Sequence, residues 1–301
     1  MRKILTTCLF SLLSPFVFAQ PLKVVASFSI LADMVREVGG SQVEVTSLVG
    51  PNADAHVFDP TPADAKRIAS AQLVVVNGLG FEGWIERLVK ASGYRGKMVV
   101  ASASINVSAQ TNDEHLTHHK HGHASVDPHA WQSLSNAERY VATIRDALVA
   151  AAPTQSAVFE QRAADYIKRI RLTDEAAKQR IALVAPDRRR VITSHDSFGY
   201  FAAAYGIKFF PLQGLTVGGE PSAAELGRII DQIRKNKVTA IFTENISDPR
   251  LLARIAKDTG AKVGGTLYAD ALSEPGTSAD TYLKMFEHNV STIVRGMTAE
   301  N

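Results

Sequence analysis

The sequence predicts an α/β protein with two lobes, each a mostly parallel sheet flanked by helices, joined by one long rigid helix. Short apolar runs rich in β-branched residues alternate with helical patterns in both halves of the chain, which is the pattern of parallel βαβ units. One long amphipathic helical pattern lies between the halves. The 301 residues are 46% hydrophobic and 21% charged, a globular composition that excludes disordered, collagen-like and coiled-coil chains.

The first residues are typical of a Sec-type signal peptide. Arg2 and Lys3 precede an apolar stretch over 4–18, and a small-residue cleavage context ends at Ala19. A transmembrane anchor is the alternative, but the apolar stretch is shorter than the ~20 residues of a membrane span and contains Pro15. We therefore expect export to the periplasm, with cleavage near Ala19.

Cys8 is the only cysteine and lies within this segment. The mature chain is therefore expected to contain no thiol, and any metal site in it must use histidine and carboxylate ligands. Removing Arg2 and Lys3 lowers the formal net charge from +3 to +1. Such a near-neutral chain gives no reason to expect nucleic acid or an anionic membrane as a partner.

The first half of the mature chain alternates strand and helix. Apolar runs predict four strands, at 22–28, 43–49, 73–78 and 97–102. Helical spacing of apolar residues predicts three helices, at 29–38, 62–70 and 82–92. Gly39-Gly40 ends the first helix, and Thr61-Pro62, an N-cap followed by proline, begins the second.

A polar segment without periodicity, 102–130, interrupts the alternation, and two helices are expected near 133–151 and 154–184. Apolar residues in the second helix recur at three- and four-residue steps opposite a charged face. About thirty residues at ~1.5 Å per residue span ~45 Å, which is longer than one small domain needs. We therefore expect this helix to be a rigid strut between the lobes.

The alternation resumes in the second half. Four further strands are expected at 189–194, 206–211, 238–244 and 261–268. Four further helices are expected at 197–205, 221–236, 248–260 and 280–297. The predicted organisation is a signal peptide at 1–19, an N-terminal lobe at 20–150, a linking helix at 151–184 and a C-terminal lobe at 185–301.

Metal-binding side chains occur where strands or the polar segment end. In open parallel sheets, ligands bind beyond the carboxyl ends of the strands. The residues in such loops are His56, His129, His195 and Asp270. Two come from each lobe, so they meet only if the lobes face each other across a cleft. Three neutral imidazoles and one carboxylate satisfy tetrahedral Zn²⁺.

This ligand set leaves a net charge near +1 on the bound site, which a neighbouring carboxylate would offset. The charge argument does not choose among the candidates Asp54, Asp127, Asp196 and Glu220. Each ligand histidine is expected to donate its other ring N–H to a carbonyl or carboxylate. Taken singly, a strand-end histidine is more often a hydrogen-bonding residue at a helix entry, and Asp270 is an ordinary N-cap residue. The conjunction of the four residues is what favours a metal site.

Five of the nine histidines lie within 115–123: His115, His118, His119, His121 and His123. One interpretation is a solvated low-complexity loop. The other is a flexible chelator that binds metal weakly near the cleft, because His-rich tracts bind metal without a packed core. The same segment ends at His129, which would tether these secondary sites to the main one. His288, within a predicted helix, is interpreted as structural.

The mature chain resembles, over essentially its whole length, cluster A-I, the zinc and manganese solute-binding proteins of bacterial ABC importers. The matching motifs are DAHVFDPTPAD, the His-rich insertion followed by DPHAW, SHDSFGYFAAAYGI, GGEPSAAEL, IFTENISD, LYADALSEPG and TYLKMFEHN. The resemblance implies two lobes joined by one long helix, with little movement on binding. It also implies a metal in the cleft, held by His56, His129, His195 and Asp270.

The resemblance points to the zinc-type members of that family. Histidine rather than glutamate at the third ligand position, His195, is typical of them, as is the histidine-rich insertion. Ala55 is a departure, because many zinc-type members carry an acidic residue immediately before the first ligand. The Trp131 context of DPHAW resembles manganese-type sequences.

The function expected is that of a periplasmic high-affinity zinc-binding protein that delivers Zn²⁺, as cargo, to an inner-membrane ABC permease. We expect a monomer, with a periplasmic metallochaperone as a further candidate partner and no nucleic acid. A manganese or iron carrier of the same family is the alternative. A zinc hydrolase is disfavoured, because four protein ligands leave no position for water and no H-E-x-x-H motif occurs. Selectivity for Zn over Mn or Cu and the roles of Asp196 and Glu220 are left open.

Overall fold

Each half of the chain folds around a four-stranded parallel sheet in the computed structural model, which describes residues 20–105, 126–212, 223–236, 238 and 240–298. The N-terminal lobe comprises β1 (Leu22–Phe28), α1 (Ser29–Gly39), β2 (Val43–Val49), α2 (Pro62–Ser70), β3 (Leu73–Val76), α3 (Ile85–Ser92), β4 (Lys97–Val100) and α4 (Leu134–Ala151). The long helix α5 (Ser156–Ala182) follows. The C-terminal lobe comprises β5 (Arg190–Thr193), α6 (Gly199–Tyr205), β6 (Lys208–Pro211), α7 (Ala223–Asn236), β7 (Ala240–Glu244), α8 (Arg250–Thr259), β8 (Lys262–Leu267) and α9 (Tyr282–Thr298).

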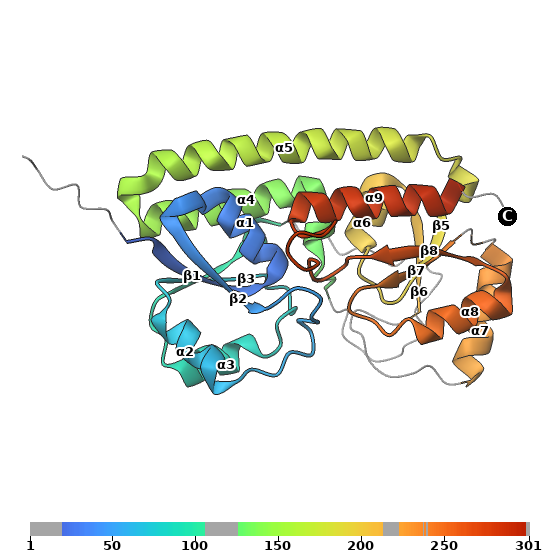
Figure 1. Ribbon diagram of the computed structural model, residues 1–301, viewed down its shortest axis with the longest axis horizontal. Coiled ribbons are helices and arrows are strands. Elements are labelled where there is room, and N and C mark those ends of the chain that lie inside the picture. The colour runs from blue at the N-terminus through green and yellow to red at the C-terminus, as the bar shows by residue number, and fades with distance from the viewer. Residues whose placement is uncertain (1–19, 106–125, 213–222, 237, 239, 299–301) are drawn as a thin grey trace, which may run out of the picture.

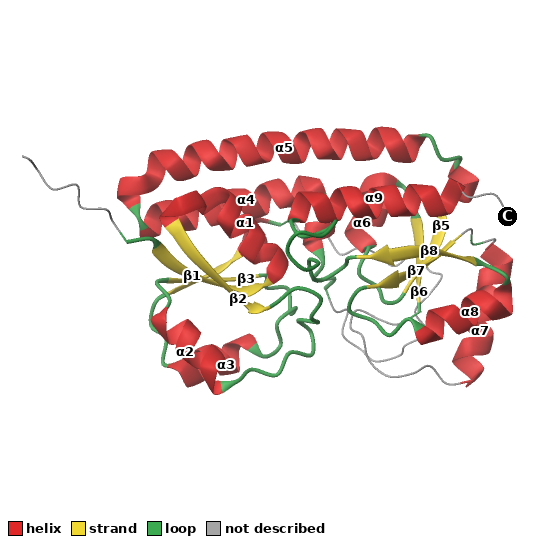
Figure 2. Ribbon diagram, in the orientation of Figure 1, coloured by secondary structure: helices red, strands yellow, loops and turns green. Residues whose placement is uncertain are grey.

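The two sheets share one topology. Their strand orders are β2-β1-β3-β4 and β6-β5-β7-β8, and every neighbouring pair is parallel. Strands β1 and β3 are buried almost throughout, as expected of strands covered by helices on both faces. The carboxyl ends of β2 and β8 point toward the junction of the lobes (Figure 2). Loops that follow the strands of both sheets therefore meet at this junction.

Helix α5 runs along both lobes (Figure 1). Its 27 residues span about 40 Å at ~1.5 Å per residue. Its buried face consists of Phe159, Ala163, Tyr166, Ile170, Ala177 and Ile181. Near its start, Arg162 donates to the carbonyl of Glu37 in α1, and near its end Arg180 donates to Ser291 in α9. The strut is thus attached to both lobes by apolar packing and by hydrogen bonds at each end.

One hydrophobic core crosses the junction of the lobes. Phe28 and Trp131 of the N-terminal lobe and Tyr282 and Phe286 of the C-terminal lobe belong to the same buried cluster. Trp131 packs against Phe28 with ring centroids 5.0 Å apart, and its carbonyl accepts a 2.5 Å hydrogen bond from the Tyr282 hydroxyl. Separating the lobes would expose these aromatic side chains to water, which gives the junction a strong preference for the closed arrangement.

The expected fold class is confirmed, and each expected helix and strand occurs with its ends shifted by a few residues. The largest shift is at α3, which begins at Ile85 rather than at Glu82. The reason is that the Glu82 carboxylate accepts the backbone N–H groups of Asn77 and Gly78, so Glu82 belongs to the turn after β3. The proposed signal peptide 1–19, the histidine cluster 115–123 and Glu220 lie outside the described residues. Within the described part of the chain, no helix is long and apolar enough to cross a membrane.

Candidate metal site

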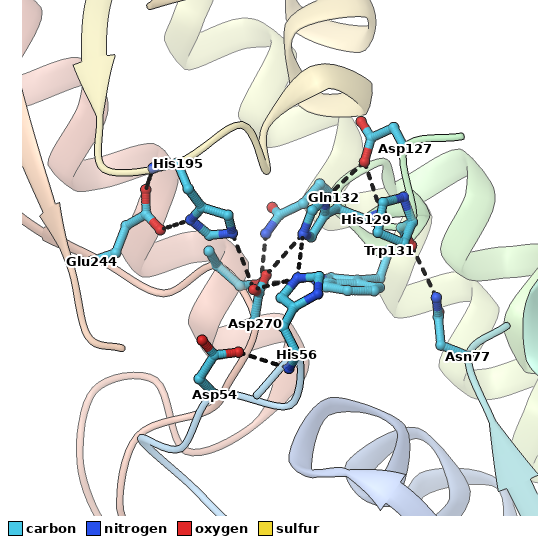
Figure 3. Close-up of polar contacts among 12 residues, drawn as sticks. Asp54, His56, Asn77, Asp127, His129, Trp131, Gln132, His195, Glu244 and Asp270 are labelled. Atoms are coloured by element: carbon cyan, nitrogen blue, oxygen red, sulfur yellow. Dashed lines mark hydrogen bonds and ion pairs between the residues drawn. The ribbon is translucent and has the colours of Figure 1, made fainter. Parts of the chain in front are cut away.

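The structure brings together the four residues that the sequence singles out. His56 lies in the loop after β2, His129 directly precedes a short 3₁₀ turn (Ala130–Gln132), His195 follows β5, and Asp270 follows β8. One nitrogen from each histidine and one oxygen of Asp270 all lie within 4.8 Å of one another. Figure 3 shows the three rings converging on the Asp270 carboxylate from different loops. Strand-end loops of both lobes therefore build one cluster.

Four distances between the donor atoms are close to those in a tetrahedral zinc site. Nε2 of His56 lies 3.2 Å from Nε2 of His129 and 3.3 Å from Oδ2 of Asp270. Nε2 of His195 lies 3.1 Å from Oδ2 of Asp270, and Nε2 of His129 lies 3.6 Å from Oδ1. Zinc bonds of ~2.0–2.1 Å in a tetrahedron place the donors about 3.3 Å apart. These four distances match that spacing, and all the donor atoms lie within 4.8 Å of one another.

The cluster is sealed from solvent. The side chains of His129, His195 and Asp270 are fully buried and that of His56 is 4% exposed. Phe81 packs edge-on against the His56 ring at 4.5 Å, and Trp131 packs against His129 at 5.3 Å. Oδ1 of Asp270 is buried and has no hydrogen-bond partner among the described residues. A buried carboxylate oxygen that lacks a partner is costly, and a bound cation would satisfy it.

Two carboxylates orient the imidazoles of His129 and His195 by contacting Nδ1, the ring nitrogen on the side away from the cluster. Asp127 lies 2.7 Å from Nδ1 of His129 and also accepts the His129 backbone N–H at 2.9 Å. Glu244 contacts Nδ1 of His195 in the same way. The neutral form of each ring, which is the form that binds a metal, therefore carries its proton on Nδ1 and directs the Nε2 lone pair into the cluster.

The four carboxylates considered as charge partners have different positions. Asp127 contacts the His129 ring, whereas Asp54 accepts, among the described residues, the backbone N–H of His56 at 2.7 Å. Asp196 makes no hydrogen bond among the described residues, and burial together with the nearby Asp127 charge raises its pKa. Glu220 lies outside the described residues. Of the three that the structure describes, Asp127 is therefore the one that contacts an imidazole of the cluster.

The protonation of the cluster follows from its charges. Burial disfavours the imidazolium form of His129, but Asp270 and Asp127 outweigh burial and raise its pKa to about 9. Glu244 and Asp270 likewise outweigh burial and raise the pKa of His195 well above its ordinary value. Burial of Asp270 is opposed by the charges of His129 and His195, which hold its pKa well below the usual range. A cation that binds here replaces protons as the partner of the Asp270 carboxylate.

Sequence reasoning missed Glu244, whose role becomes visible only in three dimensions. It ends strand β7 and is buried, and its signal was an acidic residue at the carboxyl end of an otherwise apolar strand. Nothing in the sequence links it to His195, which lies 49 residues earlier. Sequence reasoning also missed Gln132, which follows His129 by three residues and contacts a residue that is distant in the chain, Ala269. His288, as expected, serves the structure, with Nε2 3.0 Å from the carbonyl of Thr266.

The fold and the site together define a class. Two parallel α/β lobes on a stiff helical strut, with a closed cluster of three imidazoles and one carboxylate between them, are the design of a metal-carrying substrate-binding protein of an ABC importer. The chain belongs to the family described as zinc-uptake complex component A, periplasmic, whose model matches residues 24–296. Members of this family are substrate-binding transport proteins, so this protein is not an enzyme.

Curated relatives carry different metals. The chain is 31% identical to the manganese-binding lipoprotein MntA of Bacillus subtilis (strain 168), over 92% of this chain and 90% of that protein. It is 30% identical to the iron-binding protein YfeA of Yersinia pestis, over 92% of this chain and 87% of the relative. Metal binding and an ABC permease partner are thus properties of the family, while the metal differs among its members.

Solved structures of similar proteins have the same fold. The periplasmic zinc-binding protein TroA of Treponema pallidum is similar with a TM-score of 0.85 and 27% identity, over 93% of this chain and all of that one. A manganese-bound periplasmic metal-binding protein of Candidatus Liberibacter asiaticus is similar with a TM-score of 0.79 and 31% identity, over 92% of this chain and 99% of that one. The fold therefore accommodates more than one divalent cation.

Proposed function

We propose that this protein binds Zn²⁺ through His56, His129, His195 and Asp270 and delivers it to an ABC permease for zinc uptake. The observation that carries the proposal is the convergence of three imidazole Nε2 atoms on one buried carboxylate. Nitrogen-rich, four-ligand sites favour Zn²⁺ over Mn²⁺, which prefers oxygen ligands and higher coordination numbers. Cu²⁺ binds more strongly than Zn²⁺ to most such sites, so selectivity in the cell also depends on metal supply.

A manganese or iron carrier is the second candidate, and one feature of the site favours it. Oδ1 of Asp270 has no hydrogen-bond partner within the described part of the chain, so both carboxylate oxygens can bind an ion and give a five-coordinate site. Such oxygen-rich expansion suits Mn²⁺ and Fe²⁺ better than Zn²⁺. The two candidates thus differ in coordination number as well as in metal.

The remaining expectations belong to this proposal. Residues 1–19 act as a signal peptide cleaved near Ala19, and the mature monomer works in the periplasm, where a metallochaperone is a candidate partner for loading. The histidines of 115–123 form weaker secondary sites that supply the main one. The signal-peptide features of the sequence and the family description as periplasmic support this location.

The test is metal analysis of the mature protein purified from its own compartment, with X-ray absorption at the edge of the metal found. The expected result is about one zinc per chain, with three nitrogen ligands and one oxygen ligand near 2.0–2.1 Å. His195→Ala is expected to weaken zinc binding greatly. A native complement of manganese or iron with five or six ligands would favour the second candidate, and unchanged zinc affinity in His195→Ala would remove His195 from the ligand set.

A further inference from the structure

Asp270 follows strand β8 of the C-terminal lobe, but the residue before it is hydrogen-bonded to the N-terminal lobe. The carbonyl of Ala269 accepts two of these bonds, at 2.9 Å from Nε1 of Trp131 and at 2.8 Å from Nε2 of Gln132. Trp131 and Gln132 are fully buried and follow His129 directly in the chain. Figure 3 shows them beside the Asp270 carboxylate. The segment that carries His129 thus also holds the backbone of Asp270.

The residues after Asp270 are held from the same side. The backbone N–H of Leu272 donates to Oγ of Ser29 at 3.0 Å, and the carbonyl of Leu272 accepts the N–H of Asn52 at 2.9 Å. Ser29 begins α1, and Asn52 lies in the loop that carries His56. Farther along, Asp33 of α1 accepts the backbone N–H of Tyr282 at the start of α9, at 2.8 Å. Asp270 is therefore bracketed by N-terminal-lobe hydrogen bonds on both sides.

Hydrogen bonds within the C-terminal lobe also hold this segment. Asn289 of α9 accepts the backbone N–H of Tyr268 at 2.9 Å and donates to its carbonyl at 2.7 Å, and Nε2 of His195 lies 3.1 Å from Oδ2 of Asp270 itself. Asn245, which follows β7, donates to the carbonyl of Ala271 at 3.3 Å. The same amide group also donates to Oδ1 of Asn52, at 3.0 Å. The Asn245 contact is therefore shared with the N-terminal lobe, whereas the Asn289 contacts act on Tyr268, two residues before Asp270.

His195 is held differently. Its backbone N–H and its Nδ1 both bind Glu244, and its carbonyl accepts Oγ1 of Thr193 at 3.2 Å. These partners belong to the C-terminal sheet. In the helix that follows His195, Tyr200 makes a hydrogen bond between the lobes, with its hydroxyl donating to the Asp127 carbonyl at 3.2 Å. His195 itself is therefore anchored by the C-terminal lobe.

We propose that His56, His129 and Asp270 form a three-ligand half-site carried by the N-terminal lobe, and that His195 is the single exchangeable ligand, the last to bind an incoming ion and the first to leave. This inference rests on the proposed function. The proposal assigns three of the four residues to the N-terminal lobe and one to the C-terminal lobe. Their positions in the chain would instead assign two residues to each lobe. Ser29 and Gln132 are then positioning residues, because they act on Asp270 without touching the ion. Release to a permease requires only that the His195 loop withdraw.

The first test compares His129→Ala with His195→Ala. The two side chains are a matched pair, since both are fully buried imidazoles with Nε2 in the cluster and Nδ1 on a carboxylate. Zinc affinity is measured by competition with a chelator, and folding of each metal-free variant by circular dichroism. His195→Ala is expected to keep one zinc per chain, and His129→Ala to lose at least tenfold more affinity. Where His129→Ala does not fold, His56→Ala takes its place.

The outcomes separate the inference from the function it rests on. Equal losses in the two variants, or a greater loss in His195→Ala, overturn the three-to-one division while leaving zinc carriage intact. Wild-type affinity in both variants overturns the ligand set itself and with it the proposed function.

The second test concerns Ser29. Ser29→Ala leaves the buried N–H of Leu272 unpaired and is expected to speed chelator-driven zinc release about tenfold. Ser29→Thr, which keeps the hydroxyl, is expected to restore the wild-type rate. Ser47→Ala is the control, because that hydroxyl bonds only the Val49 carbonyl, at 2.6 Å, and its release rate is expected to match the wild type.

The decisive measurement introduces Ser29→Ala and Glu244→Gln, each separately, into the His195→Ala protein and compares the rates of zinc release. In that background Ser29→Ala is expected to speed release by the same factor as before, since Asp270 still binds the ion. Glu244→Gln, which acts through His195, is expected to have no effect there. Loss of the Ser29→Ala effect in the His195→Ala background would show that Asp270 and His195 work as one unit, and would overturn the proposal.

Discussion

Glu244 fixes His195 through both of its carboxylate oxygens. One oxygen contacts Nδ1 of the imidazole, and the other accepts the backbone N–H groups of Ser194 and His195 at 2.8 and 3.2 Å. Both side chains are fully buried. The orientation of the ring and the path of its loop are therefore set by one residue, and Nε2 is left facing Asp270. Because Asp127 makes the same pair of contacts with His129, two of the three imidazoles are oriented by carboxylates outside the ligand set.

Replacing Glu244 tests this arrangement. Glu244→Gln keeps the shape of the side chain but removes the negative charge that favours an Nδ1–H imidazole. Zinc affinity is expected to fall by about 10- to 100-fold, the usual cost of losing such a partner. Competition titration measures the loss, and Glu274→Gln, at an exposed position, is the matched control. Equal affinity in the two variants would show that the ring needs no carboxylate behind it.

Zinc binding is expected to strengthen with rising pH. In the metal-free protein the pKa of His129 is about 9 and that of His195 is also raised, so at neutral pH the ion must displace protons from its ligands. Calorimetry in buffers of different ionisation enthalpy is expected to show more than one proton released per zinc near pH 7. Release of no protons would mean that the metal-free rings are neutral.

The stability of the metal-free protein, in contrast to its zinc affinity, is expected to fall as pH rises. A raised histidine pKa contributes stability that is fully present below the unfolded value of about 6.5 and is lost as pH rises through about 9. Zinc therefore raises the melting temperature more at about pH 9 than at about pH 6.5. Thermal unfolding with excess zinc and with a chelator at both pH values checks this, and a larger zinc increment at the lower pH would contradict it.

The sequence predicts the fold and the inner cluster because both depend on local patterns. Strand ends are visible as the ends of apolar runs, and parallel sheets collect strand-end loops at one edge. His56, His195 and Asp270 are therefore recognised together, as metal-binding residue types that all follow strands. Glu244 carries no such mark, because an acidic residue at a strand end has several ordinary roles. The hydrogen bond from Leu272 to Ser29, which helps to hold Asp270, is equally hidden in the sequence, because these two residues are 243 positions apart. Contacts between lobes are set by tertiary packing, which periodicity does not report.

Asn77 connects the N-terminal sheet to the His129 segment, and its loss is expected to reach the metal. It is fully buried, its Nδ2 donates to the carbonyl of Pro128 at 3.0 Å, and its Oδ1 accepts the Tyr140 hydroxyl at 2.6 Å. Asn77→Ala leaves the Tyr140 hydroxyl without this acceptor and the Pro128 carbonyl with only the Ala130 N–H at 2.9 Å among the described residues, and is expected to cost about 2–3 kcal/mol of stability and to weaken zinc binding. Tyr140→Phe removes only the second bond, so it is expected to lower the melting temperature without changing zinc affinity. Equal zinc affinity in the two variants would show that Pro128 does not need this amide.

The histidine cluster at 115–123 is expected to add weak sites without contributing to the strong one. The buried cluster offers four donors, the number that a tetrahedral zinc site requires, so no ligand from 115–123 is needed there. A variant with glutamine at His115, His118, His119, His121 and His123 keeps the length of the segment and removes its imidazoles. Isothermal titration is expected to show one tight zinc per chain in both proteins, with the additional weak phase present only in the wild type. Loss of tight binding in the glutamine variant would place a histidine of this segment among the primary ligands and displace one of the four named here.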